Sequence, residues 1–472
     1  MRSKALIAVL LLLALPLLAA EPKPRPTKSE AVVLVRAWLD AERAYQRIPA
    51  VSAAVVHDQD VVWSGGSGAD ADTIYSICSI SKLFTSIAVM QLRDEGKLSL
   101  DEPVAKVLPW FAVKPAPDGG TVTIENLLTH SSGLDREADY PYWTGNFEFP
   151  THEQIVERLK TQSQLYPADA VFQYSNLGLT LAGEVVAVLS HQPYEEYVRQ
   201  HILQPIGLQS TTPQMPEAER GKRLAAGYSA VRRDGTRTLL PFFTARGIAP
   251  AAGFASTAND LAKFAAWQFR VLGGGDAVLR ARTLREMQRI HFVDPDFAVF
   301  RGLGFNVIHR DDKLFTGHPG ACPGYRTELL LQPAEKIGIV FMANAADTDS
   351  GAFAFAMYDL VAPALMREDD AAPAAALAPY AGSYSALPFG GETIFFSWGG
   401  QLASLNVPQM TPKKSITSWR TSGEHAFRRV RNDGSLGEEI VFDVGPDGRA
   451  RSVRRFSNSY PRMEGAGLAS LR

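Results

Sequence analysis

The apolar and polar positions along the chain repeat with two different periods. Apolar residues recur at the helical period over residues 31–45 and again over residues 79–92, which predicts two amphipathic helices. Gly96 and the acidic pair before it end the second pattern. Between the two helices, the β-rich runs 51–57 and 61–63 flank three polar residues and predict an antiparallel hairpin.

The middle of the chain is predicted to be mainly helical, and strands are predicted again after residue 312. Further helices are predicted over residues 151–159, 177–189, 260–269 and 351–360. Strands are predicted over residues 313–316, 325–331 and 337–342. A hairpin first, helices in the middle and strands again last predict an α+β domain over residues 28–366. In this domain a mixed sheet is closed by both ends of the chain segment and flanked by helices.

The character of the sequence changes after residue 366. Residues 367–379 read REDDAAPAAALAP, a charged and Ala/Pro-rich stretch that predicts a linker crossed by few contacts. Short β-type runs follow at 393–398, 438–444 and 451–456, with turn signals at 432–434 and 446–448. Regular short strands of this kind predict a small all-β barrel or sandwich over residues 380–472. A cut near Asp370 is therefore expected to leave a folded first domain.

The first twenty residues have the features of a targeting sequence. Arg2 and Lys4 precede an apolar run over residues 5–18, and the small pair Ala19 and Ala20 follows it. This pattern predicts a secretory signal peptide over residues 1–20. The run is shorter than the roughly 20 residues that span a bilayer, which leaves an uncleaved anchor as the alternative. We expect an exported protein, periplasmic or secreted, without stable membrane insertion after the signal is removed.

Length, composition and charge narrow the possible functions. The 472 residues exceed one ordinary core, which stops growing near about 250 to 300 residues, so two folded units are expected. A formal net charge of -2, without blocks of like charge, argues against a nucleic-acid partner. The nine histidines are scattered and no His-Glu-x-x-His or paired-cysteine spacing occurs, so no metal and no cofactor are expected. No Gly-x-Ser-x-Gly elbow is present either.

The first candidate for chemistry is the pair Ser79 and Lys82. They are three positions apart in sequence, so they share a face at the start of the predicted helix, where the helix terminus favours negative charge. A serine hydroxyl needs such a nearby base to act as a nucleophile. The alternative is that Ser79 only caps the helix and Lys82 is solvated.

Two motifs later in the chain contribute further candidate site residues. Tyr174 and Asn176 lie just before the helix predicted from residue 177, so they can project from a loop into a cleft. A phenol is a poor base at neutral pH, but a neighbouring ammonium such as that of Lys82 favours its phenolate. A half-buried tyrosine and a capping asparagine are the alternative. His318 and Gly320 follow the strand predicted to end at residue 316, where small residues allow backbone N–H groups close to a substrate carbonyl.

Together these motifs resemble the serine β-lactamase and penicillin-binding protein superfamily, in its class C and esterase-related branch. The likeness covers roughly residues 51–344 and includes the stretches GKLSLDEPVAKVLP, TVTIENLLTHSSGL and GFASTANDL. It implies a β-lactamase/transpeptidase-like fold with a helical subdomain beside the sheet. The tail from about residue 377 resembles the lipocalin-like barrel that often follows such domains.

The resemblance also implies a role for each motif residue. It implies Ser79 as the nucleophile that forms an acyl-enzyme, with Lys82 and Tyr174 as its proton-transfer partners. Asn176 would orient the lysine and the substrate. In the loop Thr-His-Ser-Ser-Gly, His130 is expected to be structural and to bond local backbone.

The third motif matches the family with one departure. The resemblance implies that His318 and Gly320 bind substrate, and that the N–H groups of Ser79 and Ala321 form the oxyanion hole. Class C β-lactamases usually have lysine where this chain has His318. A permanent positive charge that would hold a substrate carboxylate is therefore missing from the motif, which argues against β-lactamase activity but not against an acyl-enzyme.

The two cysteines of the chain are expected to pair. Cys78 precedes the expected nucleophile, and Cys322 lies two residues beyond Gly320. In the superfamily that the chain resembles these segments face each other across the active site, and an exported protein meets an oxidising compartment. The alternative is a pair of small buried thiols.

The predicted function is that of an exported serine hydrolase. It would act on an amide or ester, which could be a β-lactam, a D-amino-acid peptide or a small ester, so its partner is a small-molecule or peptide substrate. The aromatic-rich segment 135–150 is expected to wall the cleft. The alternative is a catalytically silent sensor or binding protein of the penicillin-binding type.

Overall fold

The structure is a computed structural model that describes residues 25–140, 142–367, 375–388 and 390–464. The predicted signal peptide and most of the predicted linker lie outside these ranges. Within them, no helix combines the length and the apolar character needed to cross a membrane.

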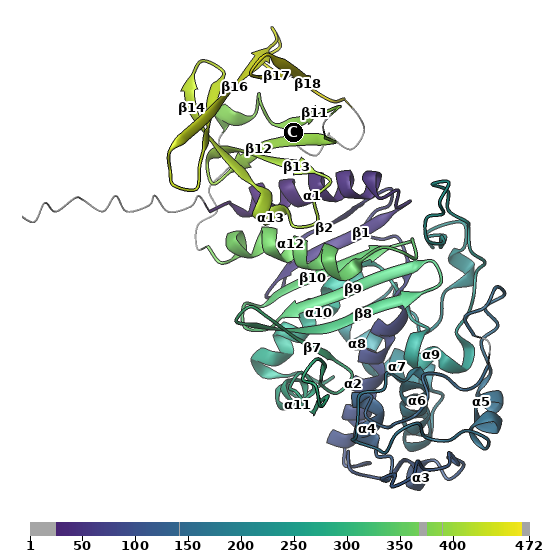
Figure 1. Ribbon diagram of the computed structural model, residues 1–472. Coiled ribbons are helices and arrows are strands. Elements are labelled where there is room, and N and C mark those ends of the chain that lie inside the picture. Colours follow the sequence, from purple (N-terminus) through teal and green to yellow (C-terminus); the bar gives the residue numbers. More distant parts are fainter. Residues whose placement is uncertain (1–24, 141, 368–374, 389, 465–472) are drawn as a thin grey trace, which may run out of the picture.

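An eight-stranded sheet forms the centre of the first domain, in the order β2-β1-β10-β9-β8-β7-β6-β5 (Figure 1). The first strands therefore pair with the last long strand, which confirms that both ends of the domain close the sheet. Every neighbouring pair is antiparallel, so the expectation of mixed strand directions is wrong. The strands are β1 (Val51–His57), β2 (Asp60–Ser67), β5 (Phe292–Val293), β6 (Phe300–Arg301), β7 (Asn306–Arg310), β8 (Lys313–Cys322), β9 (Tyr325–Gln332) and β10 (Ile337–Ala343).

Helices cover both faces of this sheet. One face carries α1 (Lys28–Tyr45) and α12 (Ser350–Leu365), and the other carries α10 (Ala258–Gly274). Next to α10, a helical subdomain packs around α2 (Ser81–Asp94) and α6 (Asn176–Ser190), as Figure 1 shows. The remaining helices of the first domain are α3 (Val104–Val107), α4 (Ile124–Thr129), α5 (His152–Leu159), α7 (Tyr194–Val198), α8 (Gln204–Ile206), α9 (Ala249–Ala252) and α11 (Ala281–Met287).

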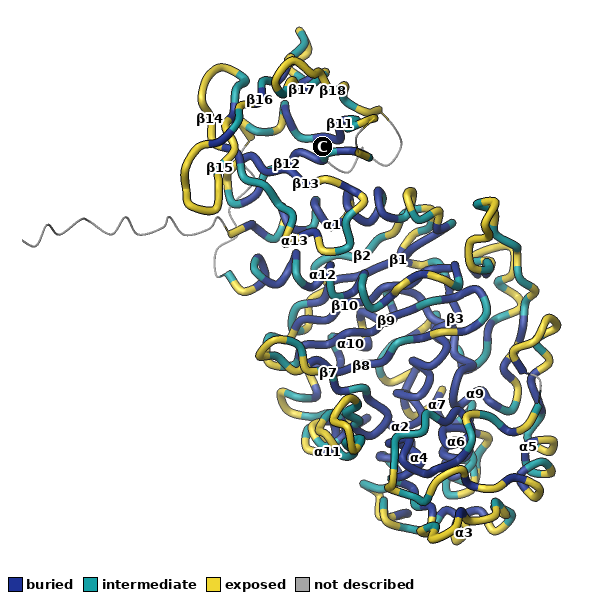
Figure 2. The backbone as a smooth tube through the Cα atoms, viewed as in Figure 1, coloured by how far each residue is buried: buried dark blue, intermediate teal, exposed yellow. Residues whose placement is uncertain are grey.

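Side-chain alternation along β10 divides the interior into two cores. Ile339 and Phe341 point to the face of α1 and α12, whereas Val340 and Met342 point to the face of α2 and α10. Such two-sided burial explains why this strand is apolar at every position, and Figure 2 shows it in the colour of buried residues.

The C-terminal part is an eight-stranded antiparallel sheet whose strands follow chain order. An isolated bridge joins Tyr384 of the first strand to Arg462, the residue after the last strand, so the sheet is nearly closed into a barrel. The α+β fold class with a small all-β barrel is thereby confirmed. Its elements are β11 (Gly382–Ser385), β12 (Glu392–Trp398), β13 (Gln401–Val407), β14 (Thr417–Gly423), β15 (Ala426–Val430), β16 (Leu436–Val444), β17 (Ala450–Arg455), β18 (Asn458–Pro461) and the short helix α13 (Pro412–Ser415).

The expectation that few contacts join the two parts is wrong. Ile394 and Phe396 of β12 belong to the same apolar core as Trp38 of α1. The indole N–H of Trp38 donates to the carbonyl of Gln409 at 2.9 Å. Glu30 of α1 accepts from the backbone N–H of Gly399 at 2.8 Å. The composition of the linker could not reveal this interface, because its apolar half lies on α1, more than 300 residues earlier.

Glu328 gives the fold a pH-dependent stability. This carboxyl of β9 is buried, and burial raises its pKa to about 8, with Ser350 as a hydrogen-bond donor at 3.3 Å. Between the ordinary pKa and the raised one, the folded protein holds a proton that the unfolded chain releases. Stability therefore falls as pH rises through this window, by up to about 4 to 5 kcal/mol.

The Glu328→Gln variant is expected to lose this pH dependence, because the amide does not titrate. Urea denaturation at pH 5.5 and 8.5 measures the difference, with Glu148→Gln at an exposed position as the control. An equal loss of stability in wild type and Glu328→Gln would contradict the assignment.

Candidate active site

Ser79 lies in a tight turn between a strand and the central helix. The turn is the 3₁₀ segment η1 (Cys78–Ile80), and α2 begins directly after it. Ser79 does not cap this helix, since the N-cap position is Ile80 and makes no side-chain bond. Cys78 has a positive φ of 48°, an uncommon conformation for a residue with a side chain. The chain thus holds the hydroxyl of Ser79 at the head of the helix in a locally strained turn.

Lys82 is fully buried beneath this hydroxyl. Its ammonium group donates to Ser79 Oγ at 3.1 Å, to Asn176 Oδ1 at 2.7 Å and to the carbonyl of Ala251 at 2.8 Å. All three donors of the group are therefore used. Burial lowers the pKa of Lys82, which makes a neutral amine more accessible near neutral pH. The alternative of a solvated lysine is wrong.

Tyr174 lies next to both Ser79 and Lys82, with Lys82 Nζ 4.9 Å from the centroid of its ring. Its hydroxyl donates to Ser79 Oγ at 2.8 Å. The residue that caps α6 is Ser175, which accepts from Gly178 N at 2.9 Å, so the capping alternative for Asn176 is wrong. Asn176 is instead the first residue of the helix, and its amide oxygen faces Lys82. The structure thus brings all four residues of the first two motifs into one hydrogen-bonded group.

Sequence reasoning missed Glu137 as a member of this group. Glu137 Oε1 accepts from Asn176 Nδ2 at 2.5 Å and from the indole N–H of Trp143 at 2.9 Å. Burial raises the pKa of this carboxyl, and Asn176 links it to Lys82. Glu137 of segment 135–150 thus reaches the site and Trp143 bonds to it, but the sequence of the segment shows no motif that singles out Glu137.

The third motif lies inside a strand and not after it. β8 continues to Cys322, six residues beyond its predicted end, so His318 and Gly320 are strand residues. A Cβ atom on Gly320 would lie 2.4 Å from the carbonyl oxygen of Ile77, which is why only glycine fits. Cys78 and Cys322 form a disulfide with their Cα atoms 5.8 Å apart. This bridge ties the turn that carries Ser79 to the strand that carries the third motif.

His318 is neutral in this environment. Burial lowers its pKa well below the usual value, and the charge of Lys82 acts in the same direction. Its Nδ1 lies 2.6 Å from the carbonyl oxygen of Pro319, so Nδ1 carries the proton and Nε2 is an acceptor. Within the described residues, this Nε2 has no hydrogen-bond partner. His318 can therefore bond a substrate group without supplying charge.

His130 has a wider structural role than expected. Its Nδ1 accepts from the backbone N–H of Ser175 at 3.1 Å. The expected bond to backbone is therefore present, but its partner is distant in sequence. Its ring stacks on that of Tyr174 with the centroids 4.4 Å apart. Burial lowers the pKa of His130 well below its usual value, so the ring that supports Tyr174 is neutral.

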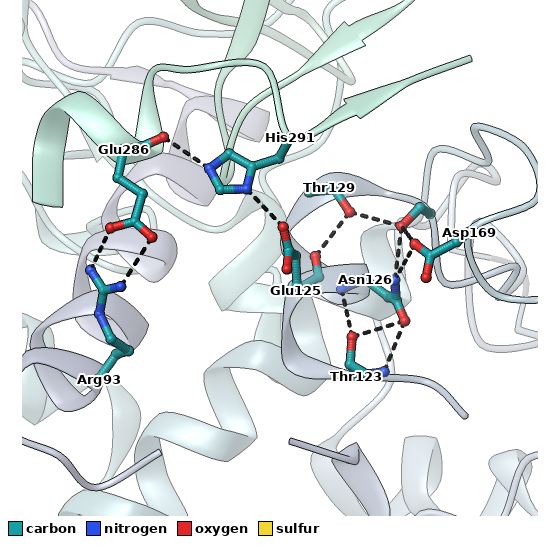
Figure 3. A network of polar contacts seen from close by, with 9 residues as sticks. Arg93, Thr123, Glu125, Asn126, Thr129, Asp169, Glu286 and His291 are labelled. Atoms are coloured by element: carbon teal, nitrogen blue, oxygen red, sulfur yellow. Dashed lines mark hydrogen bonds and ion pairs between the residues drawn. The ribbon is translucent and has the colours of Figure 1, made fainter. Parts of the chain in front are cut away.

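A polar network supports the loop that carries His130 (Figure 3). Asn126 of α4 donates to Asp169 Oδ1 at 2.6 Å. Glu125 accepts from His291 at 2.7 Å, and Arg93 of α2 forms two bonds with Glu286, at 3.1 and 3.0 Å. α2, α4 and α11 are thus fixed relative to each other behind the site.

Among the residues that the structure describes, no three His, Cys, Asp or Glu side chains lie together as a metal site would need. The groups that meet at Ser79 are a buried amine and a phenol. This set can transfer an acyl group through the serine.

Comparison with known proteins assigns the family. The model of the family described as Beta-lactamase matches residues 35–362, which is more than half of the chain. The chain belongs to the beta-lactamase family. It is a serine hydrolase related to the penicillin-binding proteins.

Similar proteins of this family occur in distant organisms. Beta-lactamase-like protein 2 of Dictyostelium discoideum is 25% identical, over 94% of this chain and 81% of its own length. The D-alanyl-D-alanine-carboxypeptidase/endopeptidase AmpH of Escherichia coli is 27% identical, over 60% of this chain and 70% of its own. The octameric penicillin-binding protein homologue from Pyrococcus abyssi has a similar fold, with a TM-score of 0.61 and 22% identity. That similarity covers 91% of this chain and 99% of the other, so it includes the C-terminal barrel.

Proposed function

We propose that this protein is an exported hydrolase that cleaves amides or esters through an acyl-enzyme on Ser79. The observation that carries the proposal is the pair of hydrogen bonds at Ser79 Oγ, from Tyr174 at 2.8 Å and from Lys82 at 3.1 Å. A serine whose hydroxyl lies between a buried amine and a phenol is placed for deprotonation, as nucleophilic catalysis requires.

In the acylation step, Ser79 Oγ forms a bond to the carbonyl carbon of the substrate. Its proton passes to the Tyr174 and Lys82 pair and from there to the leaving nitrogen or oxygen, whose bond to carbon breaks. A water molecule then repeats the sequence on the acyl-enzyme and releases the acid. Asn176 keeps Lys82 in place through its amide oxygen, at 2.7 Å from the ammonium nitrogen.

The developing oxyanion requires donors that are fixed before the reaction begins. We assign the backbone N–H groups of Ser79 and Ala321 to this role. The close approach of Gly320 to the carbonyl of Ile77 and the disulfide between Cys78 and Cys322 both bring these two segments together. His318 and Gly320 would contact the substrate beside this site.

Export rests on the predicted signal peptide over residues 1–20. Among the relatives, AmpH is named as a D-alanyl-D-alanine carboxypeptidase and endopeptidase, which supports a peptide amide as one substrate class. The barrel over residues 380–472 is lipocalin-like in this proposal, with residues 367–379 as its linker.

The test is covalent labelling with a fluorophosphonate and, separately, with a penicillin, followed by peptide mass spectrometry. We expect a single adduct on the peptide that contains Ser79 and none on a Ser79→Ala variant. Adducts of equal yield in both proteins would contradict the proposal. No adduct in either protein would favour the catalytically silent sensor.

A further inference from the structure

The two ends of the C-terminal barrel expose different side chains. Ile440 of β16 pairs with Arg455 of β17, so the residues before Ile440 and those after Arg455 lie at the same end of the barrel. Tyr384 bridges to Arg462, so the chain after β11 runs beside β18 toward this end as well. We call this end the basic rim. It comprises residues 386–388, helix α13 and the turns 431–435 and 456–457.

Exposed apolar side chains lie on three segments of the basic rim. Phe456 is 69% exposed, Leu387 is 70% exposed, and Leu436 at the start of β16 is exposed as well. The backbone of Phe456 has a positive φ of 54°, a conformation that bulky residues rarely adopt. Among the described residues of the barrel, the one other large apolar side chain that is exposed is Met463, at the opposite end. Apolar side chains gathered at one end in this way mark an interaction surface.

Basic side chains surround these apolar residues. Arg454 Nη1 donates to the carbonyl of Phe456 at 3.4 Å, and the guanidinium carbon of Arg455 lies 5.6 Å from the centroid of the Phe456 ring. Arg429 and Arg455 share one carboxylate, that of Glu438, at 3.3 and 2.6 Å. This group of three therefore keeps a net positive charge. The other basic residues of the rim are Lys413, Lys414 and Arg431.

The charge of the rim is not shared by the rest of the molecule. Against its six basic residues stand three acids, which are Asp433, Glu438 and Glu439. The opposite end has three basic and four acidic residues, which are Arg449, Arg451, Arg462, Glu424, Asp443, Asp447 and Glu464. Residues 380–472 contain 12 Lys and Arg against 8 Asp and Glu, whereas residues 21–379 contain 34 against 42. An anionic surface would therefore attract the barrel by its rim and repel the first domain.

We propose that the basic rim binds the surface of a membrane that contains anionic lipids, with Phe456 and Leu387 entering the headgroup region. Basic side chains are attracted to anionic headgroups, and aromatic side chains favour the boundary between water and hydrocarbon. A soluble polyanion would use the charges but not the apolar side chains, so the combination favours a lipid surface. In Figure 1, α2 and α6 lie at the end of the molecule away from the barrel, so a protein bound in this way keeps Ser79 away from the lipid. The inference does not depend on the acyl-enzyme at Ser79.

The test is sedimentation of the protein with vesicles of phosphatidylcholine alone or of three parts phosphatidylcholine and one part phosphatidylglycerol. We expect binding to the mixed vesicles to be at least about tenfold tighter, since each basic side chain near the surface contributes roughly fivefold. High salt is expected to remove most of this difference, because it screens the charges. Equal binding to both kinds of vesicle, or binding to neither, would overturn the inference.

Point variants locate the binding surface. Phe456→Ser is expected to weaken binding to the mixed vesicles by about tenfold, through the loss of buried apolar area. The double variant Arg431→Gln with Arg454→Gln is expected to weaken it by roughly 25-fold, because two exposed charges are lost.

The matched controls make the same changes at the opposite end of the barrel. Met463→Ser, and Arg449→Gln with Arg451→Gln, are expected to bind as wild type does, and melting temperatures show whether each variant is folded. Folded variants that lose binding equally at both ends would overturn the assignment to the rim. A protein that binds dextran sulfate but not the mixed vesicles would have a soluble polyanion as its partner, which would also overturn the inference.

Discussion

Replacing Tyr174 by phenylalanine is expected to lower kcat/KM by a factor on the order of a hundred or more, the usual loss for a general base. The change removes the hydroxyl that donates to Ser79 Oγ, at 2.8 Å, and keeps the aromatic ring. The ring retains its stacking on His130, so the loop before α6 should keep its conformation. The measurement is the hydrolysis rate of p-nitrophenyl acetate together with the rate of labelling by a fluorophosphonate.

The matched control is Tyr166→Phe, the same change at a tyrosine that is 42% exposed. This variant is expected to keep the wild-type rates. Melting temperatures of both variants close to that of wild type show that the fold is intact. Unchanged turnover in Tyr174→Phe would assign the base to Lys82 alone and contradict the shared role proposed above.

Ending the chain at Arg367 is expected to yield an insoluble or aggregated protein. The cut removes β12 and β13, whose apolar side chains Phe396 and Leu405 complete the core formed by α1 and α12. It would expose the fully buried Trp38 and leave Glu30 without its backbone donors in the barrel. Large exposed apolar patches of this kind drive association. The measurement is size-exclusion chromatography combined with labelling of Ser79.

Two point variants of the full chain measure the same interface without a truncation. Trp38→Ala is expected to lower the free energy of unfolding by about 3 to 5 kcal/mol, as for large aromatic residues in cores. Trp143→Ala, at a tryptophan that is 36% exposed, is the control and should change it far less. A soluble, monomeric truncated protein that labels like wild type would restore the original expectation of two independent domains.

The elements with strong periodicity could be predicted from the sequence. The pattern over residues 51–57 corresponds to β1 without an error, and that over residues 31–45 lies within α1. The ends of strands were harder to predict. Gly317, Pro319 and Gly320 interrupt the β-type sequence pattern of β8, but the strand continues because it stays paired with β9. Tertiary pairing there overrides the local signal of glycine and proline.

Part of the site could also be inferred from local sequence. Ser79 and Lys82 are one helical turn apart, and Tyr174 and Asn176 stand at the start of a helix, so spacing alone marks each pair. Glu137 carries no comparable mark. It is a common charged residue in a segment without a motif, and it becomes notable only through its contact with Asn176 after folding.

The sequence by itself determined the nature of this protein's chemistry, because a nucleophile and its amine must be close in the chain to share one turn of a helix. Only the tertiary structure decided the electrostatics of the site. The pKa shifts of Lys82 and His318 arise from burial, which exists only in the folded chain. Burial and pairing are properties of the folded chain, since they depend on residues far apart in sequence that meet only in the assembled sheet and helices.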